Sequence, residues 1–264
     1  MVRYLRLVGM FILASAQQEF AYRANFYIGI FHSLLNLATG WLGLLIVFHQ
    51  VESLRGWDYS SALIVLGVYL VASALRDLVI SPGLDGLAGM DGEIWRGAFD
   101  FTLLRPVNTQ FLVSLRHWRL FAFFDLLLGS GVVVAAMMRI GQGLDWPQVG
   151  LFLLMLCLSV LALYAVYLLF ASLVFWHPGF LFTWVFNSVF QMARYPIGVY
   201  PGWLRLALTW IVPIGVITTV PAQALAGELS LATVGGSVML TVTLFAVASL
   251  LFRTGLRRYS SASS

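Results

Sequence analysis

Six long apolar stretches occupy most of this 264-residue chain, and each is long enough to cross a lipid bilayer as a helix. The composition agrees, because 61% of the residues are hydrophobic and only 10% are charged, whereas about a quarter of the residues of a soluble protein are charged. We therefore predict an all-α integral membrane protein, a single transmembrane domain over residues 1–264. The six predicted transmembrane helices are Asn25–His49, Ser60–Ile80, Trp118–Met138, Val149–Phe175, Gly179–Gly198 and Leu231–Phe252.

The chain before the first span contains a ten-residue apolar run, Leu7–Ala16, which is too short to cross a bilayer. Arginines precede this run and Ala14-Ser15-Ala16 ends it, a pattern that a cleaved signal peptide also shows. The alternative is a helix that lies in the membrane interface, with its apolar side among the acyl chains and its arginines among the headgroups. We predict this interfacial helix over residues 1–23.

Residues 199–229 are apolar but are interrupted by Pro201, Pro213 and Pro221, and proline kinks or breaks a helix. They could form a seventh, kinked span, or a re-entrant hairpin of two short helices that enter one leaflet and return. Arginine placement favours the hairpin, because six spans put ten arginines on the cytoplasmic side and four outside, with both termini cytoplasmic. The ten are Arg3, Arg6, Arg23, Arg96, Arg105, Arg116, Arg119, Arg253, Arg257 and Arg258, and the four are Arg55, Arg139, Arg194 and Arg205.

A compact charged insert, residues 82–117, separates the second predicted span from the third. Within it, Asp91–Thr102 is predicted to be a short helix with acidic residues near its start, where the helix dipole favours negative charge. Pro106 then ends the helix, because the residue before a proline is pushed out of the α region. An aromatic anchor surrounded by charges suits a transient protein contact. The alternative is an ordinary cytoplasmic loop, although its four acidic residues exceed what the positive-inside rule requires.

The chain contains no lysine, so all fifteen of its basic residues are arginine. A nucleotide-binding P-loop needs the lysine of its signature to reach the β- and γ-phosphates, so this chain cannot supply that kind of ATPase itself. The four histidines have no metal-ligand partner at a useful spacing, and we predict no cofactor or metal bound by this chain. The modest net charge of +4 gives no reason to expect a nucleic-acid partner.

Two local patterns, Gly97–Pro106 after the second span and Arg194–Pro201 near the end of the fifth, occur within this order of parts. Together they resemble the membrane permease subunits of type-2 ATP-binding cassette (ABC) exporters, in the branch of roughly 260-residue stand-alone bacterial permeases. The resemblance implies a dimer with a second copy or a paralogous permease, in contact with lipid of the bacterial cytoplasmic (inner) membrane. It also implies two separate ATPase subunits that bind ATP and Mg.

In that family the insert between the second and third spans carries the coupling helix that docks on the ATPase subunit. The resemblance therefore assigns the insert to ATPase coupling and implies export of a hydrophobic or amphiphilic substrate, such as a lipid, a lipid-linked glycan or a drug-like compound. The coupling residues that we predict are Asp91, Glu93, Trp95, Arg96, Phe99, Asp100 and Arg105.

Ionisable residues inside a membrane are costly, so each of them is a candidate for function. Arg76 ends the second span and Asp125 lies near the start of the third, so the two could sit at similar depth and pair. Alternatively, Arg76 reaches to the interface and Asp125 is held by a hydroxyl or water. Asn187, Gln191 and Arg194 form one polar stripe on the fifth span, which either lines the substrate pathway or makes interhelical hydrogen bonds.

No dense polar lining of a channel is apparent in the sequence, which disfavours a small hydrophilic substrate. An ATP-independent secondary transporter is the main alternative, but it usually shows internal repeats, and the hairpin has no counterpart in the first half. An intramembrane enzyme is a third reading. It would need a nucleophile with a base, a metal site or paired carboxylates, and the sequence shows no such motif.

Overall fold

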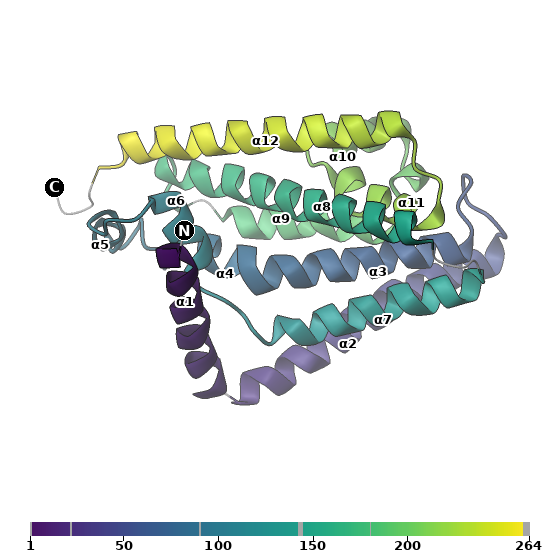
Figure 1. Cartoon of the computed structure of the whole chain (residues 1–264), viewed down its shortest axis with the longest axis horizontal. Coiled ribbons are helices and arrows are strands. Elements are labelled where there is room, and N and C mark those ends of the chain that lie inside the picture. Colours follow the sequence, from purple (N-terminus) through teal and green to yellow (C-terminus); the bar gives the residue numbers. More distant parts are fainter. Residues whose placement is uncertain (1, 22, 90, 142–144, 180, 261–264) are drawn as a thin grey trace.

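The computed structural model describes residues 2–21, 23–89, 91–141, 145–179 and 181–260, and these residues fold into helices joined by turns. Five helices run along the long axis of the molecule (Figure 1) and are long and apolar enough to cross a membrane. They confirm five of the six predicted spans. The five are α2 (Arg23–Gln50), α3 (Tyr59–Leu75), α7 (Ala122–Ile140), α8 (Trp146–Ser172) and α12 (Leu231–Arg258).

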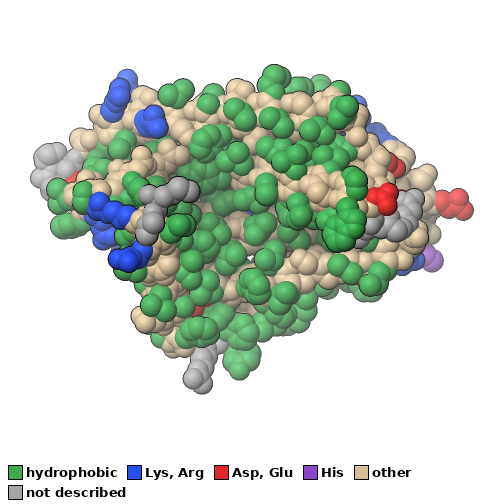
Figure 2. All heavy atoms as spheres, viewed as in Figure 1, with side chains coloured by type: hydrophobic (Ala, Val, Ile, Leu, Met, Phe, Trp, Pro, Cys, Tyr) green, Lys and Arg blue, Asp and Glu red, His purple; other side chains and the backbone are tan. Residues whose placement is uncertain are grey.

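Helix α3 lies at the centre of the bundle. In its most apolar window 72% of the residues are buried, against 33% or fewer in the other four long helices. Small residues let α7 approach it closely, because a Cβ on Gly129 would lie 2.7 Å from the backbone nitrogen of Val71. The outer faces of the other helices are apolar and exposed, and Figure 2 shows hydrophobic side chains over much of one face of the bundle. This is the surface of a protein that is solvated by lipid.

The start of α1 and the end of α12 lie at one end of the bundle, which we name the termini end (Figure 1). The turns at 51–58 and 227–230 lie at the opposite end, the far end. After α3 the chain continues through a π-helical turn, Arg76–Ile80, into the short helix α4 (Ser81–Asp85) at the termini end. An extra residue in a π turn rotates the side chains that follow it, and such turns are frequent at functional sites.

The fifth predicted span is wrong as a continuous helix. Helix α9 covers only Phe182–Phe190, and 3₁₀ turns at Gln191–Arg194 and Ile197–Val199 follow it. Tyr195 precedes Pro196 and has an extended backbone (φ −116°, ψ 149°), as a residue before proline prefers. Phe180, at the start of the predicted span, lies outside the described residues. The chain still passes from the termini end to the far end through this segment (Figure 1).

Residues 199–229 form two short helical segments at the far end (Figure 1). Helix α10 (Gly202–Trp210) is followed by a π turn (Gly215–Thr219) and α11 (Val220–Ala226), and the two parts are bent by 77°. Pro213 lies at this break. Ile214, Ile217 and Thr218 are fully buried, so the second part packs inside the protein.

Helix α1 (Val2–Ala21) lies across the termini end, roughly perpendicular to the long helices (Figure 1). It is not among the helices long and apolar enough to span a membrane. It is fixed to the chain before α7: the Ser15 hydroxyl accepts from the backbone of Trp118 (3.1 Å), and Glu19 accepts from the backbone of Phe121 (3.2 Å). A helix is therefore present within residues 1–23, with Met1 and Tyr22 outside the described residues.

The insert 82–117 begins within α4 and contains two further short helices, α5 (Phe99–Leu103) and α6 (Thr109–Leu115). The helix predicted over Asp91–Thr102 is wrong for most of its length, because residues 91–98 form turns. Gly97 adopts φ +72°, a left-handed conformation that interrupts a right-handed helix and that glycine adopts without strain. Phe99 anchors the insert, since it is fully buried and packs edge-on against Phe175 and Tyr259.

Candidate functional site

Two polar cavities lie among α2, α3, α7 and α9. The narrow cavity, about 260 Å³, lies between the middle parts of these helices. The wide cavity, about 940 Å³, extends to α1, α4 and α8 near the termini end. Both cavities are lined by His32, Ser33, Arg76, Asp77, Asp125 and Asn187, so one polar layer joins them. The polar lining that the sequence did not reveal is therefore present, because the fold assembles it from single residues on separate helices.

Arg76 lies at the junction of the cavities with a side chain only 13% exposed. Its guanidinium donates two hydrogen bonds to the neighbouring Asp77 (2.9 and 3.0 Å) and a third to the Asn187 side chain (3.0 Å). It also lies over the Phe190 ring, 5.2 Å from the centroid. The π turn that begins at Arg76 aims adjacent residues into the same space. Arg76 is therefore a fixed part of the cavity wall, with its charge neutralised by Asp77.

The predicted ion pair between Arg76 and Asp125 is wrong. Arg76 has its close partner within its own turn, and Asp125 lies beside the hydroxyl of Ser33 on α2. Asp125 lies in the first turn of α7, where the helix dipole favours negative charge. The Ser33 hydroxyl donates to the backbone carbonyl of Gly29 (2.9 Å), so the alternative in which a hydroxyl or water holds Asp125 stays a prediction. Both residues nevertheless line both cavities.

The predicted polar stripe lines the narrow cavity with all three of its residues, Asn187, Gln191 and Arg194. Two of them also make interhelical hydrogen bonds. Asn187 accepts from Arg76, and Arg194 donates to the side chains of Asn36 and Thr39 on α2. Gln191 is exposed and has no side-chain hydrogen bond among the described residues. The stripe is thus part of the wall and also fastens α9 to its neighbours.

Sequence reasoning missed several lining residues of the wide cavity, among them Glu19, Asp77, Asp85 and Tyr167. Asp85 accepts a hydrogen bond from the Thr183 hydroxyl of α9 (2.7 Å). Tyr167 of α8 is 1% exposed and packs edge-on against Phe182 and Phe186. A polar residue at the end of an apolar run was the available signal for Asp85, but nothing in the sequence placed it against α9.

The insert exposes apolar side chains at the termini end. Trp95, Phe101 and Leu104 are 53%, 72% and 80% exposed. The prediction that Phe99 belongs to an exposed anchor is wrong, because Phe99 is fully buried and Phe101 and Leu104 project instead. The cause is the left-handed backbone at Gly97, which interrupts the predicted helix and so changes which side chains lie on the same face.

An ion pair between Glu93 and Arg116, both largely buried, makes the insert rigid, and Thr102 donates to Glu93 and accepts from Arg116 (3.3 and 3.2 Å). Asp91 and Arg96 pair on the surface, and Arg105 is exposed. Asp100 is partly buried. The predicted coupling residues therefore divide into a buried support and an exposed face.

Burial raises the pKa of the Glu19 carboxyl on α1, although hydrogen bonds from the backbone of Phe121 and Leu120 and the charge of Arg119 oppose this. Burial also lowers the pKa of His117, with the charge of Arg116 acting in the same direction. Among the described residues, no group of three or more His, Cys, Asp and Glu lies close enough to hold a metal ion. The cavity is thus charged and polar without being arranged for metal ligation.

A multi-pass helical bundle with a polar cavity inside it is the architecture of a membrane transport protein. A family model described as ABC-2 family transporter protein matches residues 34–263, nearly the whole chain. The chain therefore belongs to the ABC-2 transporter family and is an ABC-2 type permease. The family is the membrane component of a transporter and works with ABC ATPase subunits. No curated protein sequence matches the chain.

Proposed function

We propose that this permease forms the translocation pathway of an ABC exporter for an amphiphilic substrate. Two separate ATPase subunits bind ATP and Mg and drive it, and a second copy or a paralogous permease completes the pathway. Closed two-fold symmetry is the commonest form of such an assembly. The polar cavities offer room for a headgroup, and the exposed apolar faces of the surrounding helices offer contacts for lipid or for a hydrophobic tail.

The observation that carries this proposal is the geometry of the insert. Its exposed face, Trp95, Phe101 and Leu104, stands on a support that reaches the core through Phe99. The insert begins within α4, whose Asp85 lines the wide cavity. A push on the exposed face would therefore be transmitted to the cavity wall through packed residues. This is what coupling of ATP hydrolysis to transport requires.

We further propose the orientation that the arginines favour, with the termini end in the cytoplasm of a bacterial inner membrane. Helix α1 then lies in the cytoplasmic interface, because it runs across the end of the bundle and not along it. The bent pair α10 and α11 then forms a re-entrant hairpin at the outer face, where the 77° bend turns the chain. The six crossings are the five long helices together with the α9 segment.

Substitution in the exposed face tests the coupling proposal. The chain is purified from its native membrane with a tag, and ATP hydrolysis in the purified fraction is measured. Phe101→Ala with Leu104→Ala should remove most of this activity, because hot-spot residues of an interface typically contribute about 2 kcal/mol or more each. The thermal midpoint of the permease should stay unchanged, since both side chains are exposed.

Phe99→Ala is the matched control in the same helix. It removes a fully buried ring, so it should lower the free energy of unfolding by about 3–5 kcal/mol. ATP hydrolysis that survives the change at Phe101 and Leu104 in a folded permease would rule out this docking face.

A further inference from the structure

The wide cavity has an excess of acidic side chains. Four carboxylates line it, Glu19, Asp77, Asp85 and Asp125, against two arginines, Arg76 and Arg119, with His32 and His117 beside them. Arg76 forms an ion pair with Asp77. Glu19 has two backbone donors and the charge of Arg119 near it. The charge of Arg119 is shared among Glu19, Asp85 and Asp125, so the carboxylates of this cavity outnumber its arginines.

The Asp85 carboxylate accepts a hydrogen bond from the Thr183 hydroxyl, and Asp125 lies beside Ser33, whose hydroxyl donates to the backbone carbonyl of Gly29. Neither carboxylate has an arginine or histidine nitrogen within 4.0 Å in the described part of the chain. A partly buried carboxylate without a counter-ion is costly inside a membrane protein, and such a residue marks a ligand or ion pathway. A bound cation would remove this cost.

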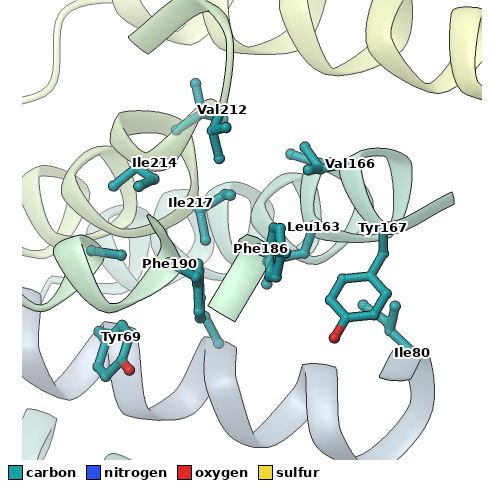
Figure 3. Close-up of a cluster of buried hydrophobic side chains, with 14 of the residues drawn as sticks. Tyr69, Ile80, Leu163, Val166, Tyr167, Phe186, Phe190, Val212, Ile214 and Ile217 are labelled. Atoms are coloured by element: carbon teal, nitrogen blue, oxygen red, sulfur yellow. The ribbon is translucent and has the colours of Figure 1, made fainter. Parts of the chain in front are cut away.

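A second, independent feature also points to a ligand. Tyr167 is only 1% exposed and lines the wide cavity, and its hydroxyl makes no hydrogen bond within the described part of the chain. Figure 3 shows its ring reaching from α8 toward α3, with the hydroxyl at the end that points away from α8. A buried tyrosine hydroxyl normally has a partner. Here the open position can accept a hydrogen bond from a donor in the cavity.

The rest of the wall selects the kind of cation. Phe26, Trp118, Phe121 and Phe124 also line the cavity, and aromatic faces attract organic cations. A metal ion would need several ligands at one point, and no such group exists among the described residues. The volume of about 940 Å³ is that of a site for a drug-sized group.

We propose that the wide cavity binds the cationic head group of an amphiphile, with Asp85 and Asp125 as the counter-charges and Tyr167 as a hydrogen-bond acceptor. This assignment rests on the proposed function for the role of the amphiphile as substrate. The binding itself needs no ATPase subunit. It can therefore be measured on the full-length permease alone.

The test compares two probes of the same shape and opposite charge, tetraphenylphosphonium and tetraphenylborate. Equilibrium dialysis against the purified permease in detergent, with a detergent blank subtracted, gives a dissociation constant for each. Asp125→Asn and Asp85→Asn should each weaken tetraphenylphosphonium binding about tenfold or more, because each removes a counter-charge in a partly buried site. Neither should weaken tetraphenylborate binding. Glu52→Gln removes an exposed carboxylate from the far end and should leave both constants unchanged.

Tyr167→Phe separates the hydrogen bond from the charge. It should weaken binding of 4-phenylbutylammonium, which has N–H donors, more than binding of tetraphenylphosphonium, which has none. The asparagine in Asp85→Asn keeps an oxygen that accepts from Thr183, so this variant should fold. If one of the two aspartate variants does not fold, the other is sufficient for the test.

The assignment is overturned if tetraphenylphosphonium still binds with unchanged affinity after both aspartate changes. It is also overturned if the permease prefers tetraphenylborate and the aspartate changes abolish that preference. If cation binding depends on the aspartates but no ATP hydrolysis is found with the permease purified from its native membrane, the cavity assignment is supported and the proposed export function is rejected.

Discussion

Asp58 shows at the residue scale how one side chain fixes the start of the central helix. Its carboxylate accepts from the backbone of Ser60 and Ser61, both at 3.2 Å, and so caps α3. Burial raises the pKa of the Asp58 carboxyl, but the hydrogen bonds from Ser61 and Ser60 outweigh burial and hold the pKa below its usual value. The ionised form is therefore the one that stabilises the fold.

Asp58→Ala should lower the free energy of unfolding by about 1 kcal/mol at neutral pH, the typical value of an N-cap. Because the pKa is lower in the folded state, this contribution is present above the unfolded value of about 3.9 and is lost as the pH falls through the folded pKa. Denaturant unfolding in detergent at neutral and acid pH checks it. A difference between the two proteins that did not change with pH would contradict the cap.

Two glycines in α7 give a matched pair at the same scale. A Cβ on Gly129 would lie 2.7 Å from the backbone nitrogen of Val71, whereas a Cβ on Gly131 would meet nothing within 4 Å. Gly129→Ala should push α7 away from α3 and clearly lower the thermal midpoint. Gly131→Ala should keep or raise it, since alanine is favoured over glycine in a helix by up to about 1 kcal/mol. Equal midpoints for the two variants would show that the close α3–α7 contact does not matter for stability.

At the scale of elements, the long uninterrupted apolar runs were predicted well and the interrupted ones poorly. Helices α2, α3, α8 and α12 agree with prediction because a run of about 20 apolar residues has only one way to satisfy its backbone in lipid. Helix α9 was overestimated, since Pro196 forces Tyr195 out of the α region. In the insert, residues 91–98 form turns instead of the predicted helix, and Phe99, predicted as a coupling residue, is buried while Phe101 is exposed.

At the scale of the whole molecule, the two ends of the bundle should face opposite sides of the membrane. Single cysteines at Ser260, near the end of α12, and at Glu52, in the far-end turn, test this in a permease that carries Cys157→Ser. In intact cells an impermeant maleimide should label position 52 and leave position 260 unlabelled until the membrane is opened. Labelling of position 260 from outside would reverse the orientation and place the insert outside the cell.

The sequence by itself determined that this chain lives in a bilayer, how long most of its helices are, that it lacks a P-loop and where its charged insert lies. These are local properties, because composition and run length act on each segment separately. The tertiary structure alone decided that Asp85, Asp125 and Tyr167 share one cavity, that Arg76 pairs with Asp77, and that Phe99 is buried. Such neighbours come from helices far apart in the chain, and their contacts depend on packing and on single turns that shift which side chains face inward.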